Sequence, residues 1–457
     1  MEGKMAGTPG PEEVSTKLQR IAELAREAPG RVLTSLAHHI DVEFLHEAYR
    51  RTRKDGAVGT DEQTADEYGQ RLSENLRSLL ERFKSGSYWA PPVRRVYIPK
   101  GDGRKTRPIG IPTFEDKVLQ RAVTMVLEAI YEQDFLDCSY GFRPGRSAHE
   151  ALEAVWRGTT RLGHGGYVVD VDIKSFFDTL SHTHLRSFLD QRVRDGVLRR
   201  MIDKWLKAGV LEAGEVRHPE LGTPQGGVIS PILSNIYLHH VVDRWFAEDV
   251  LPRLRGRAFL VRYADDLVIG CEHESDARRI MEALGGRMER YDLALHPEKT
   301  RLVKFGKPSD RPGDDEGDGD GRPPTAFDFL GFTHVWSRAR KGWTVKRRTA
   351  KSRFSRAVRK IALWCRSHRH WSVADQHTAL CRKLKGHDAY YGITGNIGAL
   401  RRLRIVVRRV WQKWLNRRSH RNRMPWDRFL RLVERFPLPM ARIVHSYVGR
   451  HAANPPS

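Results

Sequence analysis

The stretch Phe259-Leu-Val-Arg-Tyr-Ala-Asp-Asp-Leu-Val-Ile-Gly270 places two adjacent carboxylates between two apolar runs. The runs Phe259–Tyr263 and Leu267–Cys271 have the length of strands and a polar turn separates them, which predicts a β-hairpin with Asp265 and Asp266 at its tip. Adjacent carboxylates repel each other, and burial of either one costs desolvation free energy. A hydrophobic hairpin tolerates such a pair when a divalent cation neutralises it. The alternative is a solvent-exposed Asp-Asp turn.

A second acidic strand end lies earlier in the chain, in Tyr167-Val-Val-Asp-Val-Asp-Ile-Lys-Ser-Phe-Phe-Asp178. Nucleotidyl transfer by two metal ions, roughly 4 Å apart, needs acidic ligands that converge from separate elements. Such ions activate a primer 3′-hydroxyl and stabilise the leaving pyrophosphate. Asp172 together with Asp265 and Asp266 supplies this ligand set. The sequence therefore predicts a site for two Mg²⁺ ions, with Mn²⁺ as an alternative.

Strand-like and helical periods around these segments predict further elements. Helical spacing recurs through residues 16–90, and the strands and helices expected after it lie at 94–99, 106–111, 114–131, 166–171, 182–208, 229–246, 274–291 and 329–335. Residues 307–324 are rich in Gly, Asp and Pro, which predicts a flexible acidic insertion. Residues 1–15 are expected to be a disordered N-terminus and 451–457 a tail.

The charge of the chain is concentrated at one end. The 457 residues carry a net charge of +24, and residues 331–450 hold 31 Lys and Arg against 4 Asp and Glu, so the remainder is close to neutral. A domain this basic predicts binding to nucleic acid, with strong salt dependence. A solvated basic surface is the alternative.

The sequence argues against three other classes of protein: membrane-spanning, secreted and zinc-ribbon or zinc-knuckle proteins. No stretch approaches the roughly 18 apolar residues that a membrane span needs, and the N-terminus lacks the apolar core of a signal peptide. The four cysteines are too far apart in the sequence for a zinc ribbon or knuckle. We therefore expect a cytoplasmic protein of bacterial type with no membrane partner.

The order of seven motifs resembles that of the reverse transcriptases encoded by group II introns. The resemblance runs from about Tyr49 to Gly449 and includes Arg107–Thr113, Ser139–Ser147, Asp172–Asp178, Thr223–Gly227, Tyr263–Asp266, Glu298–Thr300 and Phe329–Phe332. It implies an α+β fold of the right-hand polymerase type. The N-terminal helices and fingers would then occupy residues 16–160, a palm with a small antiparallel sheet 161–338, and a basic helical thumb or maturase domain 339–450.

The resemblance also implies roles for single residues. Asp172, Asp265 and Asp266 would be the catalytic metal ligands. In the family an aromatic residue follows the first catalytic Asp by five positions, which fits Asp172 with Phe177. Phe177 would then be the steric gate that excludes a 2′-hydroxyl and selects dNTPs, with a core Phe as the alternative.

The triphosphate of the dNTP would be held by residues outside the acidic motifs. Lys100 and Arg107 on the presumed fingers hairpin would grip it, unless they are solvated strand charges. Gln225 resembles the residue that contacts the incoming nucleotide. Lys299 resembles a lysine proposed as general acid for pyrophosphate departure, and an exposed lysine is the alternative.

Two arginines lie in the loop Ser139–Ser147. Arg143 and Arg146 would contact the backbone of the RNA template. Structural capping of the loop is an equal alternative.

The expected function is RNA-directed DNA synthesis from an RNA template, a DNA or RNA primer and dNTPs. The basic domain would bind the group II intron RNA and assist its splicing and mobility. No endonuclease is expected, because no Cys and His cluster follows the basic domain. The alternatives are a splicing maturase with little polymerase activity and a related reverse transcriptase used in defence or spacer acquisition.

Overall fold

The computed structural model describes residues 11–99, 106–212, 215–217, 222, 226–308, 326–339, 342–419 and 423–446. Lys100, Gln225, the tail and most of the predicted insertion lie outside these residues. The described helices and strands confirm an α+β class. The chain forms two compact units, of which unit 1 holds residues 1–151, 171–269 and 275–301, and unit 2 holds 152–170, 270–274 and 302–457.

Four helices open unit 1, as the apolar spacing predicted. They are α1 Pro11–Glu27, α2 Val42–Arg51, α3 Ala65–Gln70 and α4 Leu72–Ser85. Helix α1 begins at Pro11, so the prediction of disorder was wrong for residues 11–15. Thr64 and Glu67 form a capping box that fixes the start of α3.

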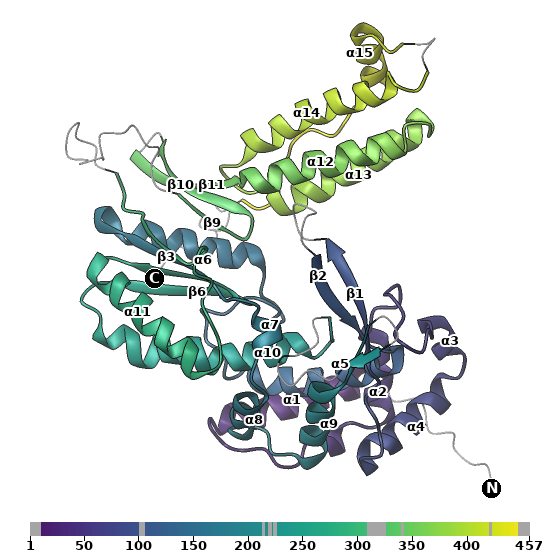
Figure 1. Cartoon of the computed structure of the whole chain (residues 1–457), viewed down its shortest axis with the longest axis vertical. Helices are drawn as coiled ribbons and strands as arrows, with labels where there is room; N and C mark the ends of the chain where they lie inside the picture. Colours follow the sequence, from purple (N-terminus) through teal and green to yellow (C-terminus); the bar gives the residue numbers. More distant parts are fainter. Residues whose placement is uncertain are drawn as a thin grey trace. The chain divides into compact units, whose positions relative to one another are not determined.

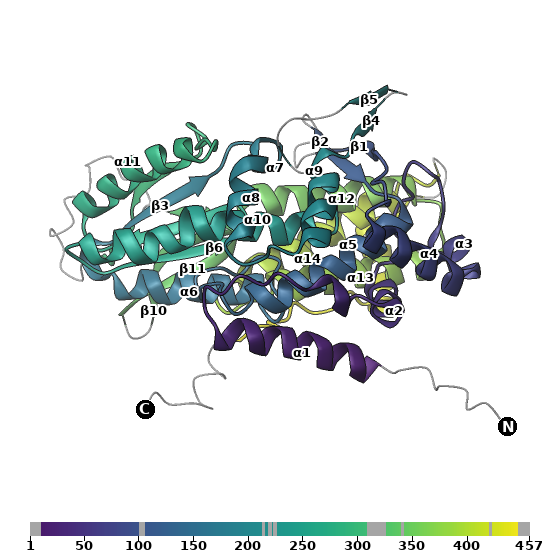
Figure 2. The ribbon, with the colours of Figure 1, turned by 90° about the horizontal axis from the view of Figure 1, so that it is seen from below.

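A hairpin and a long buried helix follow. Strands β1 Val93–Pro99 and β2 Thr106–Ile111 pair antiparallel, and α5 spans Phe114–Tyr131, as predicted. The Thr113 side chain caps α5 by accepting from the Asp116 amide. Two strands of three residues each, β4 Val210–Glu212 and β5 Glu215–Arg217, were not predicted and extend the hairpin in the order β2-β1-β4-β5 (Figure 2).

The predicted carboxylate hairpin lies in a second sheet with the strand order β6-β7-β3-β8. Its strands are β3 Tyr167–Asp172, β6 Ala258–Tyr263, β7 Asp266–Cys271 and β8 Arg301–Lys304. The helices of this part of the chain are α6 Ala148–Arg161, α7 Phe176–Thr179, α8 His182–Asp190, α9 Gly196–Lys207, α10 Ser230–Leu238 and α11 Glu274–Arg290. The single helix predicted over 229–246 is α-helical only to Leu238 and then continues as π-helix at 239–243 and 245–250.

In unit 2, the predicted basic helices begin later than expected. Strands β9 Phe327–Phe329, β10 Phe332–Ala339 and β11 Gly342–Thr349 form an antiparallel sheet before them. The single strand predicted at 329–335 is therefore interrupted by a turn at Leu330 and Gly331, and the helical prediction was wrong for 342–349.

The helices of unit 2 are α12 Lys351–Ser367, α13 Val373–Tyr391, α14 Ile397–Leu415 and α15 Trp426–Arg435. Figure 1 shows the first three side by side. The apolar stripe of α14 faces inward, with Leu403, Val407 and Trp411 buried in one core cluster. Among the described helices none is long and apolar enough to cross a membrane.

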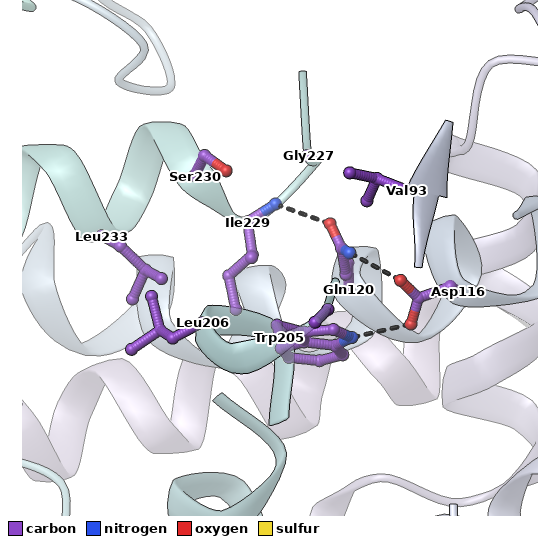
Figure 3. A pocket seen from close by; sticks show the side chains of 10 residues that line it. Val93, Asp116, Gln120, Trp205, Leu206, Gly227, Ile229, Ser230 and Leu233 are labelled. Carbon is purple, nitrogen blue, oxygen red and sulfur yellow. Dashed lines mark hydrogen bonds between the residues drawn. The ribbon is translucent and has the colours of Figure 1, made fainter. Parts of the chain in front are cut away.

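The carboxylate of Asp116, in unit 1, is almost fully buried. Asp116, on the first turn of α5, accepts hydrogen bonds from Trp205 Nε1 at 2.7 Å and from Gln120 Nε2 at 2.8 Å (Figure 3). It also accepts a hydrogen bond from Tyr88 OH at 3.1 Å. Burial raises the pKa of Asp116 from its usual 3.8 to about 6, against the lowering effect of these donors. The folded protein therefore binds this proton more tightly than the unfolded chain does.

This difference predicts how stability changes with pH. The contribution of Asp116 to the free energy of unfolding is greatest below the unfolded pKa and falls by about 3 kcal/mol as the pH rises through the folded pKa. We expect Asp116→Asn to lack this slope, so wild type loses stability relative to the variant between about pH 4 and about pH 7. Urea unfolding across this range measures the difference. The exposed Asp249→Asn is the control, and a pH-independent difference for Asp116→Asn would contradict the prediction.

Candidate active site

The tip of the hairpin β6–β7 is a two-residue loop made of Ala264 and Asp265. Strand β6 ends at Tyr263 and β7 begins at Asp266. Two-residue hairpin loops require positive φ, and Ala264 has φ +56°. This conformation costs an L-residue about 1–2 kcal/mol. Neighbouring groups must therefore hold the tip in place.

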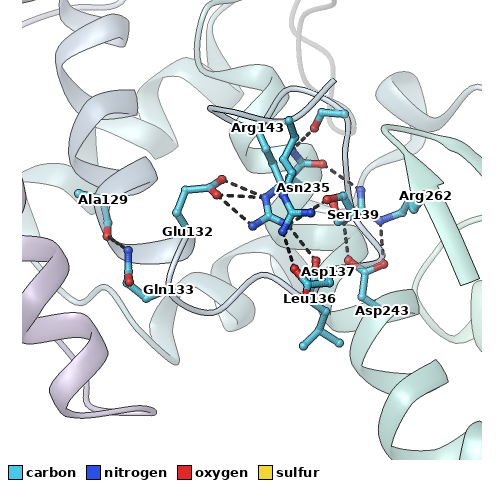
Figure 4. A network of polar contacts seen from close by, with 12 residues as sticks. Ala129, Glu132, Gln133, Leu136, Asp137, Ser139, Arg143, Asn235, Asp243 and Arg262 are labelled. Atoms are coloured by element: carbon cyan, nitrogen blue, oxygen red, sulfur yellow. Dashed lines mark hydrogen bonds and ion pairs between the residues drawn. The ribbon is translucent and has the colours of Figure 1, made fainter. Parts of the chain in front are cut away.

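Arg262 supplies the main support from inside (Figure 4). Its side chain is fully buried, and Nε and Nη2 donate to the two carboxylate oxygens of Asp243 at 2.7 and 2.6 Å. Nη1 donates to Asn235 Oδ1 at 2.9 Å and to the Ala264 carbonyl at 3.2 Å. The guanidinium thus joins the strained tip to α10 and to the π-helix after it.

The π-helix helps to explain how Asn235 and Asp243 reach the same guanidinium. These residues are eight positions apart, and eight residues of α-helix would leave their side chains about 80° apart around the axis. The wider turns of the π-helical residues 239–243 reduce this angle. The irregular helix therefore brings both side chains toward Arg262.

A loop segment supports the other side of the tip. The Arg262 amide donates to the Cys138 carbonyl at 2.7 Å, and the Tyr140 amide donates to the Arg262 carbonyl at 2.9 Å. A Cβ atom at Gly141 would lie 2.3 Å from the Ala264 amide nitrogen, so only glycine fits. Asn235 Nδ2 also donates to the Gly141 carbonyl at 2.8 Å.

Arg143, in the same loop, is not available to bind a template. Its side chain is 4% exposed. It donates to both carboxylate oxygens of Glu132 and to the carbonyls of Leu136 and Ser139. The structure therefore corrects the RNA-contact prediction in favour of capping. Arg146 is partly exposed and pairs with Asp137, and its predicted contact with template stays a prediction.

Asp172 lies at the end of β3 and is paired with Lys299. The His296 amide donates to the Asp172 carbonyl at 2.8 Å, which brings the following turn alongside the strand end. Lys299 Nζ then lies 2.8 Å from Asp172 Oδ2. Both side chains are partly exposed, so the ammonium is free to exchange this carboxylate for another anion.

Asp265 lies close enough to Asp172 for the two carboxylates to interact. Burial raises the pKa of Asp265, and the Asp172 carboxylate raises it further. Arg107, exposed on β2, and Lys299 act in the opposite direction. Asp266 is exposed at the start of β7. The structure therefore brings together the predicted residues Asp172, Asp265, Lys299 and Arg107.

The donor set suits Mg²⁺ bound with its substrate rather than alone. Among the described residues, no three His, Cys, Asp or Glu side chains gather into a metal-binding cluster. Mg²⁺ is usually held by one or two carboxylates while water and substrate phosphates fill its other positions. Asp172 and Asp265 provide hard oxygen ligands of this kind. These residues therefore fit the predicted ion.

Phe177 lies in the short helix α7, five residues after Asp172. The neighbouring Phe176 is buried, its ring 5.4 Å from the Phe177 ring, whereas Phe177 itself is half-buried. Gly222 packs against this turn with φ +88°, and a Cβ atom there would lie 2.6 Å from the Phe177 carbonyl oxygen. Phe177 is therefore partly accessible in the segment that follows Asp172.

The family assignment rests on the whole of this region. Residues 98–334, just over half of the chain, match the family model described as reverse transcriptase (RNA-dependent DNA polymerase). The chain belongs to the reverse transcriptase family. The carboxylate tip and the strand end at Asp172 both lie inside the matched residues.

Relatives in the family include proteins encoded by introns. The chain is 33% identical over 304 residues to "Group II intron-encoded protein LtrA" of Lactococcus lactis subsp. cremoris, covering 63% of this chain and 49% of that protein. It is 35% identical over 324 residues to "Protein YkfC" of Escherichia coli (strain K12), covering 63% and 84%. The chain thus spans about half the length of the first relative. These matches confirm the predicted resemblance to group II intron reverse transcriptases.

Sequence reasoning missed the residues that support the site. Arg262 lies in an otherwise apolar strand. A charged residue inside a buried strand indicates that a buried countercharge lies nearby, so the sequence did contain a signal for this residue. The partners Asn235 and Asp243 gave no such signal, because both lie on an ordinary-looking helix. Gly141 lies in the motif Ser139–Ser147, but the sequence did not indicate why a glycine is needed there.

The buried ion pair predicts a large effect of a small change. Asp243→Asn leaves the Arg262 guanidinium buried without a countercharge, so we expect the free energy of unfolding to fall by about 3–5 kcal/mol and primer extension to fall with it. Glu248→Gln is the matched control, because it breaks the exposed Arg244–Glu248 pair on the same helical segment and should cost less than about 1 kcal/mol. Urea unfolding of both variants measures the difference, and equal small losses would contradict the role of Arg262.

Proposed function

We propose that this chain is an RNA-directed DNA polymerase of the group II intron type. The observation that carries the proposal is the approach of two carboxylates from separate strands, Asp172 on β3 and Asp265 at the β6–β7 tip, with Arg107 and Lys299 beside them. An acidic pair flanked by cations suits a reaction in which a metal-bound triphosphate loses pyrophosphate.

The side chains of the proposed site divide the work of binding. Arg107, with its planar fork, and Lys100 would hold the triphosphate, and Gln225 would contact the nucleotide. Phe177 would pack under the sugar and exclude a 2′-hydroxyl, so that dNTPs are selected. Two Mg²⁺ ions held by Asp172, Asp265 and Asp266 would supply activation of the primer 3′-hydroxyl and stabilisation of the leaving group, and Mn²⁺ could replace them.

Lys299 would act on the leaving group. Its ammonium is a mobile point charge that pairs with Asp172 in the protein alone. When a triphosphate binds, the ammonium can turn to the pyrophosphate oxygens and donate a proton as they leave. The exposure of the Lys299 side chain, 57%, leaves it room for this movement.

The proposed layout is a right hand. Residues 16–160 would form the N-terminal helices and fingers, 161–338 the palm and 339–450 the thumb or maturase domain. The exposed arginines of α12 and α14 would bind the phosphates of intron RNA and so assist its splicing and mobility. The absence of an endonuclease stays a prediction.

The metal-ligand assignment has a direct test. We expect Asp265→Asn to lower oligo(dT)-primed copying of poly(rA) by more than about 100-fold, because replacement of even an indirect metal partner costs about 10–100-fold. RNA affinity should be unchanged, since the carboxylate does not bind RNA. The exposed Asp249→Asn serves as the control. Extension by Asp265→Asn at near the wild-type rate would sink the assignment, and a wild-type protein that binds RNA without copying it would favour the maturase alternative.

The RNA-binding assignment is tested through salt dependence. Arg401 and Arg408 are exposed on α14. Changing both to Gln should weaken RNA binding and reduce the slope of log affinity against log salt by about 1 for each lost phosphate contact. Arg20→Gln with Arg77→Gln removes the same charge from exposed positions on α1 and α4. Equal slopes for both double variants would contradict the assignment.

A further inference from the structure

Gln120, on α5, holds the start of helix α10. Its buried side chain accepts hydrogen bonds through Oε1 from the backbone amides of Val228 at 2.7 Å and Ile229 at 3.2 Å. The N-cap residue of α10 is Ile229, whose side chain makes no capping hydrogen bond. The Gln120 carbonyl oxygen, which comes from another helix, therefore holds the two residues that precede the first turn of α10.

The orientation of the Gln120 amide is set by Asp116. Gln120 Nε2 donates to Asp116 Oδ2 at 2.8 Å (Figure 3). The other oxygen of Asp116 accepts from Trp205 on α9 and from Tyr88, which precedes β1. Every neighbour of Asp116 is a donor, so the amide of Gln120 presents its nitrogen to Asp116 and its oxygen to α10. The direction of the chain of hydrogen bonds is fixed.

Gly226, four residues before α10 begins, lies directly against strand β2. Gly226 has φ +112°, and a Cβ atom there would lie 2.6 Å from the Gly110 carbonyl oxygen and 2.7 Å from Ile109 Cγ2. Arg107 is three residues before Gly110 on the same strand. The position of α10 and the position of Arg107 are therefore coupled through one backbone contact.

Gly222 ties the same segment to Phe177 on its other side. Its amide donates to the Leu180 carbonyl at 2.8 Å, and His182 Nε2 donates to its carbonyl at 2.6 Å. Gly222 is thus held beside Phe177, and Val228 and Ile229 are held by Gln120.

We propose that Gln120, oriented by Asp116, is a positioning residue for the incoming nucleotide. It fixes the start of α10 against β2, so that Arg107 and Phe177 keep the separation that a bound dNTP requires. Gln120 is buried and does not touch the nucleotide, and its effect passes through backbone position. This inference rests on the proposed polymerase function.

Water cannot readily replace the Gln120 oxygen. The cavity beside it, lined by Asp116, Gln120, Trp205 and Ile229 among others, has a volume of about 10 Å³. This is the lower limit for a single water molecule. Loss of the Gln120 oxygen without a change of volume should therefore leave the amides of Val228 and Ile229 without a partner.

The test exchanges the amide of Gln120 and the carboxylate of Asp116, first one at a time and then together. In Gln120→Glu, at a pH where both carboxylates are ionised, a carboxylate oxygen faces Asp116 Oδ2 with no donor between them. In Asp116→Asn, an NH₂ group faces either the Gln120 NH₂ or the donors Trp205 and Tyr88. The double variant Asp116→Asn with Gln120→Glu restores every donor to an acceptor and keeps the total charge of the pair at −1. If Gln120 acts through these hydrogen bonds, the double variant should recover the function that each single variant loses. If Gln120 only fills space, no such recovery is expected.

The measurement is single-nucleotide primer extension across a range of dNTP concentrations. We expect each single variant to raise KM for dNTP by about tenfold while kcat changes by less than about threefold, since a misplaced binding group weakens substrate affinity. The double variant should return KM to within about threefold of wild type. Gln133→Glu, at the other end of α5 and hydrogen-bonded to Arg26, controls for added charge.

Different outcomes overturn different claims. Single variants with a wild-type KM overturn the inference, as do variants in which KM, kcat and melting temperature change together and the double variant rescues none of them. A wild-type protein that extends no primer overturns the proposed polymerase function and this inference with it. Normal wild-type extension with no effect at Gln120 overturns the inference alone.

Discussion

The guanidinium of Arg262 lies fully buried between Asp243 and the carbonyl of Ala264, and the position of the hairpin tip depends on it. Taking two charges out of water is costly, and a buried pair is favourable only when its remaining donors are also satisfied. Asn235 satisfies one of them. The buried ion pair therefore matters mainly because it holds the hairpin tip in position. The tip contains Ala264 in a left-handed conformation, which alanine does not favour.

Local patterns predicted much of the fold, because they describe what each segment does by itself. The alternation of Arg94–Pro99 and Thr106–Ile111 gave the strands almost to the residue, and the apolar face of 114–131 gave α5. What the patterns could not contain was contact between distant segments. Asn235 and Asp243 meet Arg262 only because a helix widens into π-helix, and a burial of Arg143 against Glu132 leaves no trace in a Gly- and Pro-rich loop. Strands β4 and β5 are too short to show a period.

The candidate site was predicted in part for a similar reason. Carboxylates at strand ends are visible in a sequence because charge next to an apolar run is unusual. Asp172 and Asp265 were found in this way, and in the structure burial, with a further contribution from the Asp172 carboxylate, raises the pKa of Asp265. The backbone amides and glycines that hold these carboxylates in place are common in any sequence. Their role becomes clear only from the contacts that they make in the structure. Gly141 and Gly226 are required because another backbone occupies the place of their side chains.

Two buried polar networks meet at α10. Gln120 binds the amides just before its first turn, and Asn235, one turn inside it, binds Arg262 and the Gly141 carbonyl. The position of the carboxylate tip and the position of the strand that carries Arg107 therefore both depend on the same short helix. A helix that is buried along its length, as α10 is, moves as one body, since its interior contacts resist independent displacement of either end. A displacement of either network should therefore move both the carboxylate tip and the strand that carries Arg107.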